Sequence, residues 1–206
     1  MNQSIKIFCD SLINSLNEIP EERSLILNRL ANSIRASIQK DGNAKIIYIC
    51  THNSRRSHFG QIWAKVAASY FGIENVETFS GGTEVTAFNS NAIEALRKQG
   101  FAIITDDSNE SNPIYHVNYG GKDQIRCFSK VYNDSENPTK NFIAVMTCSD
   151  AEANCPFIPN VSARIGVTYE DPKKFDGTTM QSEKYLERSE QIALESLYVF
   201  SKLKNI

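Results

Sequence analysis

The sequence lacks the signals of several classes of protein. No apolar run approaches the roughly 18 residues that a membrane-spanning helix needs. The start, MNQSIKIFCDSL, has no basic stretch followed by an apolar one, as a signal peptide would. The net charge of -2 over 206 residues gives no excess of positive charge for a nucleic-acid surface. We therefore expect a cytoplasmic protein with no membrane partner and no nucleic-acid partner.

Metal-binding spacing is absent from the sequence as well. The cysteines form no CxxC pair of the kind that holds zinc, and His52, His58 and His116 do not cluster with them. An odd number of cysteines without an export signal predicts free thiols in a reducing compartment. We expect any disulfide to be transient, and we expect no bound metal or cofactor. The five cysteines are Cys9, Cys50, Cys127, Cys148 and Cys155.

What the chain does contain is the composition of a globular domain, with 41% hydrophobic and 22% charged residues. Two helical apolar patterns come first, over residues 3–18 and from Pro20 to Gly42. We predict an N-terminal helical hairpin at residues 1–42, which is either a packing appendage or a homodimer contact. The main domain is expected to cover residues 43–206.

The main domain alternates strand patterns and helix patterns. KIIYIC, which begins at Lys45, is a continuous β-branched apolar run, typical of a strand buried on both faces. A helix pattern follows over residues 57–71. This order predicts an α/β fold with an open, mostly parallel sheet and helices on both faces. The other expected strands are 75–80, 142–148 and 163–169, and the other expected helices are 89–99 and 181–203.

A polar insert at residues 105–141 interrupts this order. Two alternating pieces within it, PIYHVNY and IRCFSKVY, predict a β-hairpin across the turn at Gly120 and Gly121. We expect an inserted flap, for which the sequence indicates no function.

The stretch YICTHNSRRSHFG, residues 48–60, places a cysteine before a polar loop that leads into a helix. Its spacing is cysteine, five residues, arginine and serine, at Cys50, Arg56 and Ser57. Successive N–H groups of a short loop at a helix N-terminus form an anion nest, which the helix dipole reinforces. A guanidinium at the end of the loop can grip a tetrahedral oxyanion in two places. The residues expected to bind the oxyanion are Thr51, His52, Asn53, Ser54, Arg55 and Arg56.

Cys50 lies at the base of this nest and would face the central atom of the anion. The positive field of the loop favours the thiolate, so we expect Cys50 to be the nucleophile. Ser57 is expected either to cap the helix or to hydrogen-bond the thiolate. The alternative is a buried cysteine followed by a solvated basic turn. The carboxyl end of a parallel strand, where open α/β sheets bind ligands, favours the oxyanion loop.

With this loop the chain resembles the low-molecular-weight tyrosine phosphatase fold family, which includes the thioredoxin-coupled arsenate reductases. The resemblance covers roughly residues 44–204 without the 105–141 insert. The chain departs from the family at His52, where glycine is usual, and at Arg55, where a second cysteine is frequent. Histidine tolerates positive φ better than most residues, which would allow the loop to close.

Transfer of a phosphoryl or arsenyl group to a thiolate needs a proton for the departing oxygen. The segment TYEDPKKFDGT supplies Asp171 directly before a proline and matches the family's aspartate-proline acid. The alternative is an ordinary surface turn, in which Asp-Pro is common. We expect the neighbouring Glu170 and Asp176 to be solvated.

The segment MTCSDAEANCPFIP, residues 146–159, carries Cys148 and Cys155 and is similar to the redox segment of the arsenate reductases. In a helix, two residues seven positions apart, as these cysteines are, lie about 10.5 Å apart along the axis. A disulfide needs its two Cα atoms about 4.4–6.8 Å apart. A bond between the two cysteines therefore requires the polar segment between them to unwind or to form a loop.

The resemblance implies an arsenate reductase with a relay of three thiols and no bound cofactor. In this relay Cys50 forms an adduct with arsenate, with the help of Asp171. Cys148 then displaces arsenite, and Cys155 carries the disulfide outward for reduction by the partner, thioredoxin. The expected substrate is accordingly arsenate or a phosphate-type oxyanion.

Two other hypotheses stay open. The first is a tyrosine phosphatase of the same fold that acts through a phosphocysteine, although Lys173 and Lys174 replace the aromatic pair that usually follows the acid. The second is a catalytically silent module that binds phosphate or senses redox state. Cys9 and Cys127 match no family position, and we expect them to be core or incidental residues.

Overall fold

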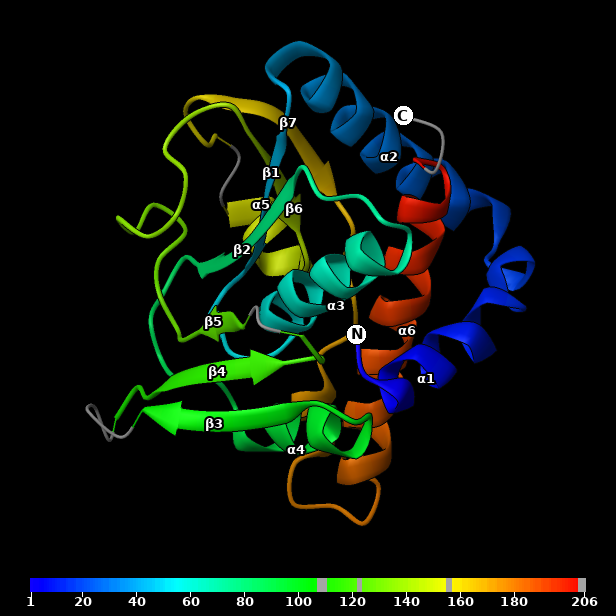
Figure 1. The fold of residues 1–206 in the computed structure, drawn as a ribbon. Helices are drawn as coiled ribbons and strands as arrows, with labels where there is room; N and C mark the ends of the chain where they lie inside the picture. The colour runs from blue at the N-terminus through cyan, green and yellow to red at the C-terminus, as the bar shows by residue number, and fades with distance from the viewer. Residues whose placement is uncertain (107–110, 122–123, 155–156, 204–206) are drawn as a thin grey trace.

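A computed structural model describes residues 1–106, 111–121, 124–154 and 157–203. Figure 1 shows a parallel sheet with helices around it and a smaller antiparallel sheet next to α4. The helices are α1 (Gln3–Ile13), η1 (Leu16–Glu18), α2 (Glu21–Asp41), α3 (Arg56–Tyr70), α4 (Ser90–Lys98), α5 (Ser149–Asn154), η2 (Pro172–Phe175) and α6 (Gln181–Ser201). The strands are β1 (Ala44–Cys50), β2 (Val76–Gly82), β3 (Ala102–Asp106), β4 (Ile114–Asn118), β5 (Ile125–Cys127), β6 (Phe142–Met146) and β7 (Val161–Gly166).

The parallel sheet has the strand order β2-β1-β6-β7, and every neighbouring pair is parallel. This confirms the α/β fold that the alternating strand and helix patterns predict. Since all four strands run the same way, their carboxyl ends meet at one edge. Cys50, the last residue of β1, lies there opposite Gly82 of β2. Cys148 follows β6 at the same edge.

Strand β1 is buried on both faces, as its continuous apolar run predicts. Ile46 and Tyr48 belong to the apolar cluster on one face, and Ile47 and Ile49 belong to the cluster on the other. The helices α2 and α3 pack on the sheet, and α6 packs on both of them. The second cluster also contains Cys50 and Cys148 together with Ala151 of α5 and Ile158.

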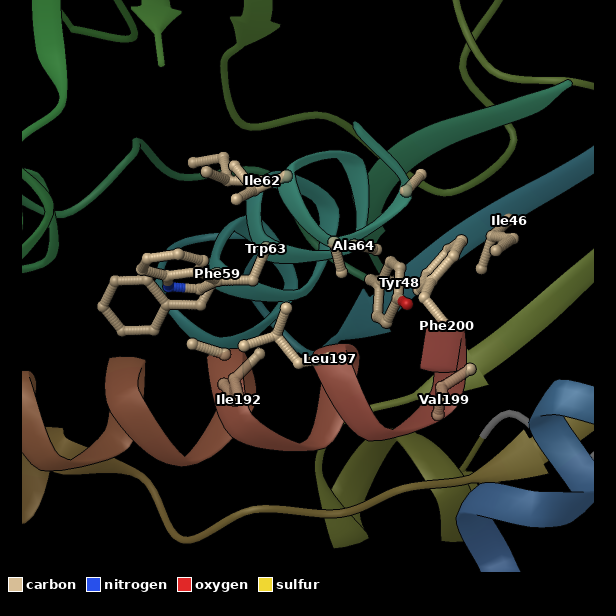
Figure 2. Packing of buried hydrophobic residues seen from close by; sticks show 14 of the residues in the cluster. Ile46, Tyr48, Phe59, Ile62, Trp63, Ala64, Ile192, Leu197, Val199 and Phe200 are labelled. Atoms are coloured by element: carbon tan, nitrogen blue, oxygen red, sulfur yellow. The ribbon is translucent and has the colours of Figure 1, made fainter. Parts of the chain in front are cut away.

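The interface between α3 and α6 forms the centre of the larger cluster (Figure 2). Phe59 and Trp63 of α3 face Leu197 and Ile192 of α6, and all four are at most 1% exposed. Burial of one such side chain stabilises the fold by roughly 1.5–3 kcal/mol. This packing fixes α3, and therefore the loop that precedes it, against the sheet.

The N-terminal helices pack into the same cluster as the sheet. Ile5 of α1 and Leu27 and Ile34 of α2 are at most 1% exposed and belong to it. Helix α2 ends at Gly42, whose φ of 76° is the left-handed conformation of a glycine cap. Both helices contact α6, and α2 also contacts β1 and β7. Residues 1–42 thus share one core with the residues that carry the loop.

The predicted hairpin forms within the insert. Strand β4 pairs antiparallel with β5, on either side of the turn that contains Gly120. Strand β3, which pairs with β4 and begins at Ala102, before the expected insert, was not predicted from the sequence. After β5 the chain turns back to the edge of β2, where Gly82 donates to Lys130 O and accepts from the N–H of Tyr132. The insert therefore reaches the carboxyl edge of the parallel sheet.

Strand β7 begins and ends earlier than the expected 163–169, at Val161 and Gly166. The chain beyond it still follows β6, because the N–H of Tyr169 donates to Thr147 O at 3.1 Å. None of the helices in the described ranges is long and apolar enough to cross a membrane.

Candidate functional site

The loop between β1 and α3 closes through Asn53, which has a positive φ of 44°. The strained position is thus one residue beyond His52, at a residue type that tolerates this conformation. Asn53 is fully buried, and its side-chain amide makes two hydrogen bonds. Oδ1 accepts from the N–H of Lys130 at 2.9 Å, and Nδ2 donates to Ser57 Oγ at 2.8 Å. The insert therefore sets the orientation of this amide.

Ser57 contacts the thiol of Cys50, with 3.1 Å between Oγ and Sγ. Because Ser57 Oγ already accepts from Asn53, its own hydrogen is free to be donated to the sulfur. The N-cap of α3 is Arg55, which makes no side-chain cap. Of the two roles expected for Ser57, the structure supports the contact with sulfur. Such a donor stabilises negative charge on sulfur, as a thiolate nucleophile requires.

Arg56 connects the loop to the expected acid. Arg56 is 8% exposed, and its guanidinium donates to Tyr169 O at 2.8 Å and to Asp171 Oδ2 at 2.6 Å. The other carboxylate oxygen of Asp171 accepts from the N–H of Lys173 at 3.0 Å and caps η2, in which Pro172 is the first residue. Asp171 is therefore held beside the loop by an arginine on one side and a helical turn on the other.

Arg55 is also directed toward the segment that carries the acid. Its Nε donates to Tyr185 OH at 2.8 Å, and Tyr185 OH donates to Asp176 Oδ1 at 2.8 Å. Burial raises the pKa of Tyr185, so the phenol stays neutral and can donate. Asp176 is exposed, as expected, and its carboxylate accepts this hydrogen bond. Glu170 is exposed as well and pairs with Lys174.

Cys148 lies beside the loop that Cys50 begins. It is fully buried, and its Sγ is 3.5 Å from the Oγ1 of Thr51, the residue after Cys50. The N–H of Ala151, in the first turn of α5, donates to the same sulfur at 3.3 Å. Cys155 lies outside the described residues. Because α5 occupies Ser149–Asn154, a bond between Cys148 and Cys155 would require α5 to unwind.

The insert and the end of β2 contact the backbone of the loop and support it. His52 O accepts from the hydroxyls of Thr86 and Ser129, each at 3.0 Å. A Cβ atom on Gly82 would lie 2.7 Å from Thr51 O and 2.8 Å from Asn53 N. The sequence indicated no function for the insert, because these contacts join residues that are far apart in the chain. The insert acts here as a support of the loop.

We expect Gly82→Ala to displace the loop, because the added methyl would meet backbone atoms that cannot rotate away. The expected cost is about 1–3 kcal/mol in the free energy of unfolding, together with at least tenfold weaker binding of inorganic phosphate. Titration calorimetry and thermal unfolding measure these effects. Gly60→Ala is the matched control, since its methyl would meet the ring of Tyr48 rather than the loop. Equal losses of phosphate affinity in both variants would contradict this assignment.

Cys9 and Cys127 are buried away from the loop. Burial raises the pKa of each thiol to about 12, which leaves about one thiol in ten thousand ionised at pH 8. Cys127 donates to Gln61 Oε1 at 3.9 Å. Both residues are therefore neutral thiols in the core.

Cys9 and Cys127 are expected to resist alkylation as long as the protein is folded. Iodoacetamide at pH 8 should leave both unmodified, because it reacts with accessible thiolates. Peptide mass mapping after a timed reaction measures this, and protein denatured in guanidinium gives the fully labelled reference. Labelling of either cysteine at the rate of the denatured reference would contradict their placement.

A cavity of about 550 Å³ opens beside the loop. It mixes positive side chains with the aromatic rings of Phe88 and Tyr115, and it borders the loop on the side of Arg55. The further lining residues of the cavity are His52, Ser54, Thr86, Ala87, Asn89, Ser90, Ser111, Pro113 and Lys173.

Within the described parts of the chain, no group of three or more His, Cys, Asp or Glu residues is placed to hold a metal ion.

Together these residues place a buried thiol before the loop, with a hydroxyl directed at the sulfur, two arginines and a carboxylate linked to the loop, and a second thiol beside Thr51. The structure brings all the predicted site residues together except Cys155, which it does not describe. It adds Tyr169 and Tyr185, which the sequence did not indicate. Such a set can hold a tetrahedral oxyanion, attack it with sulfur and protonate the departing oxygen.

No family model matches the chain. The arsenate reductase of Bacillus subtilis is 30% identical to it over 145 residues, which are 70% of this chain and 86% of that protein. The arsenate reductase of Oceanobacillus iheyensis is 32% identical over 135 residues, which are 65% of this chain and 78% of that protein.

Solved structures of similar fold include low-molecular-weight phosphatases. A phosphotyrosine phosphatase of this kind from Vibrio cholerae superposes with a TM-score of 0.53, at 13% identity, over 79% of this chain and 98% of its own. The solution structure of a protein tyrosine phosphatase from Bacillus subtilis gives 0.50, at 15% identity, over 78% and 97%. At these identities the likeness establishes the fold and no activity.

Proposed function

The chain belongs to the arsenate reductase family, and on this premise we propose that it reduces arsenate to arsenite through a relay of Cys50, Cys148 and Cys155. The observation that supports the relay best is the position of Cys148. Its sulfur is buried next to Thr51, which directly follows the nucleophile. A phosphatase needs only one thiol at this place.

In the first step the Cys50 thiolate attacks arsenic in the nest formed by residues 51–56. The attack forms a sulfur–arsenic bond and breaks one arsenic–oxygen bond. Asp171 is the group that protonates the departing oxygen, and Arg56 balances the charge of the remaining oxygens. Ser57 stabilises the thiolate before the attack. Arsenic is still pentavalent in this adduct.

In the second step the Cys148 thiolate attacks the sulfur of Cys50. A Cys50–Cys148 disulfide forms, and the electron pair of the sulfur–arsenic bond stays on arsenic, which leaves as trivalent arsenite. Cys155 then attacks Cys148, frees the Cys50 thiolate and completes a Cys148–Cys155 disulfide. The two electrons that reduce arsenic thus come from two thiols, and thioredoxin restores them.

Transfer of the disulfide to Cys148 and Cys155 makes it reachable for a partner protein. Cys148 is fully buried, whereas Phe157, two residues after Cys155, is 78% exposed. Unwinding of α5 would bring the disulfide to this surface. We therefore place thioredoxin at the segment around Phe157, in the reducing cytoplasm where free cysteines persist.

Phosphomonoester hydrolysis is the second candidate function, because Cys50, Arg56 and Asp171 would also serve a phosphocysteine mechanism. The two functions differ in whether they need the other thiols. Arsenite release in the presence of thioredoxin, thioredoxin reductase and NADPH reports the first, and hydrolysis of an aryl phosphate reports the second.

The test compares the native protein with Cys155→Ser in both assays. Loss of catalytic arsenite release with retained aryl phosphate hydrolysis supports the relay. Full arsenate turnover by Cys155→Ser would refute the relay. Cys127→Ser is the control for a thiol outside the relay and should keep native rates in both assays.

A further inference from the structure

We propose that Arg23, in the N-terminal helix α2, positions the oxyanion-binding Arg56 through Glu195 and Tyr169. This inference rests on the proposed function in one respect, namely that Arg56 grips the oxyanion. If Arg23 has this role, the N-terminal helices contribute to the reaction site, although they are far from the site residues in the sequence.

The connection begins with a buried ion pair between α2 and α6. Arg23 donates from Nε to Glu195 Oε1 at 2.9 Å and from Nη2 to Glu195 Oε2 at 2.7 Å. The two side chains are 19% and 5% exposed. An arginine bound to a carboxylate in this two-pronged way fixes direction as well as distance.

Tyr169 is held by both members of this pair. Its hydroxyl donates to Glu195 Oε2 at 2.8 Å, and the guanidinium of Arg23 lies over its ring, 4.8 Å from the centroid. Burial and the nearby Glu195 carboxylate raise the pKa of Tyr169 well above its ordinary value, so its hydroxyl keeps its proton and donates. The tyrosine ring is therefore fixed at its end and on its face.

The backbone of Tyr169 touches both reactive segments. Its carbonyl accepts from Arg56 Nη1 at 2.8 Å, and its N–H donates to Thr147 O at 3.1 Å. Thr147 immediately precedes Cys148, and Asp171 follows two residues after Tyr169. One residue thus joins the loop arginine, the acid segment and the strand that leads to the second thiol.

Tyr169 needs such an anchor because it lies beyond the end of β7 at Gly166. Taking two charges out of water is costly, and a pair of apolar side chains can stabilise a fold equally well. What an apolar pair would not supply is the directed bond that places the Tyr169 carbonyl against Arg56. The arrangement therefore assigns Arg23 the role of a positioning residue.

The experiment measures binding of inorganic phosphate by titration calorimetry, since this anion occupies the nest but cannot be reduced. Arsenate KM and kcat are measured in parallel. The variants are Tyr169→Phe, which removes one oxygen atom, and the double replacement Arg23→Met with Glu195→Met, which removes both charges together. Arg29→Met is the control, because Arg29 is exposed on the same helix.

We expect Tyr169→Phe and the double replacement each to raise the phosphate Kd and the arsenate KM about tenfold, with kcat changed less than about threefold. All three changes combined should have no larger effect, since they interrupt one connection. A phosphate Kd within twofold of native in folded Tyr169→Phe would overturn the proposal, as would additive effects. Weakened phosphate binding in a protein that releases no arsenite would refute the arsenate reductase function and leave this inference standing.

Discussion

Cys50→Ser is expected to abolish arsenite release and aryl phosphate hydrolysis, each by at least about 10⁴-fold. The sulfur of Cys50 forms the covalent bond in both reactions, and a serine hydroxyl is a far weaker nucleophile than a thiolate. Ser57, which contacts this position, directs its hydrogen at it and cannot act as a base there, because its oxygen already accepts from Asn53. Steady-state rates in both assays measure the loss.

Two controls separate this loss of chemistry from unfolding. Cys50→Ser should still bind inorganic phosphate, because Arg56 and the loop backbone remain. Cys9→Ser makes the same atomic change at a buried thiol in the core and should keep native turnover. Measurable arsenite release by Cys50→Ser, above about one part in a hundred of the native rate, would refute the assignment of the nucleophile.

Cys148→Ser is expected to lower arsenate turnover by at least about 10³-fold and to change aryl phosphate hydrolysis by less than about threefold. In the proposed relay this sulfur attacks the Cys50 adduct and leaves the electron pair on arsenic, whereas hydrolysis of a phosphocysteine needs only water. The reason for expecting such selectivity is geometric. The Cys148 sulfur is 3.5 Å from the Thr51 hydroxyl, and Cys148 is not one of residues 51–56, which are proposed to hold the oxyanion.

The difference between the two assays distinguishes a redox role of Cys148 from structural damage. A buried serine could disturb α5, since the N–H of Ala151 donates to the sulfur. Such damage would lower both activities together. Parallel losses of similar size in the two assays would therefore contradict a redox role for Cys148, and Cys127→Ser provides the reference for a buried cysteine outside the site.

The sequence predicted those parts of the molecule that depend on local patterns. The continuous apolar run before Cys50 indicated a buried parallel strand, and the strand and helix order indicated the sheet. The turn glycines indicated the hairpin of the insert. Cys50, Arg56 and Ser57 were predicted as site residues because loop chemistry constrains residue types over a few positions, and Asp171 was predicted from the aspartate-proline pair that follows a strand.

Asn53 and Arg55 were predicted to belong to the loop, but their partners across long chain separations were missed. The N–H of Lys130 orients the Asn53 amide, and Arg55 donates to Tyr185, which is 130 positions away. Periodicity and turn signals say nothing of such pairs, because they describe neighbours in sequence. The same holds for Arg23 and Glu195, 172 positions apart, so no function in the site was predicted for the N-terminal helices.

A single turnover without any external reductant tests the relay most directly. Fully reduced native protein is mixed with excess arsenate, quenched in acid with a thiol-blocking reagent and analysed for arsenite and for disulfide-linked peptides. The account predicts one arsenite released per chain and one disulfide, between Cys148 and Cys155, with Cys50 free. Release of arsenite with all three cysteines still reduced, or no release while aryl phosphate is hydrolysed, would contradict it.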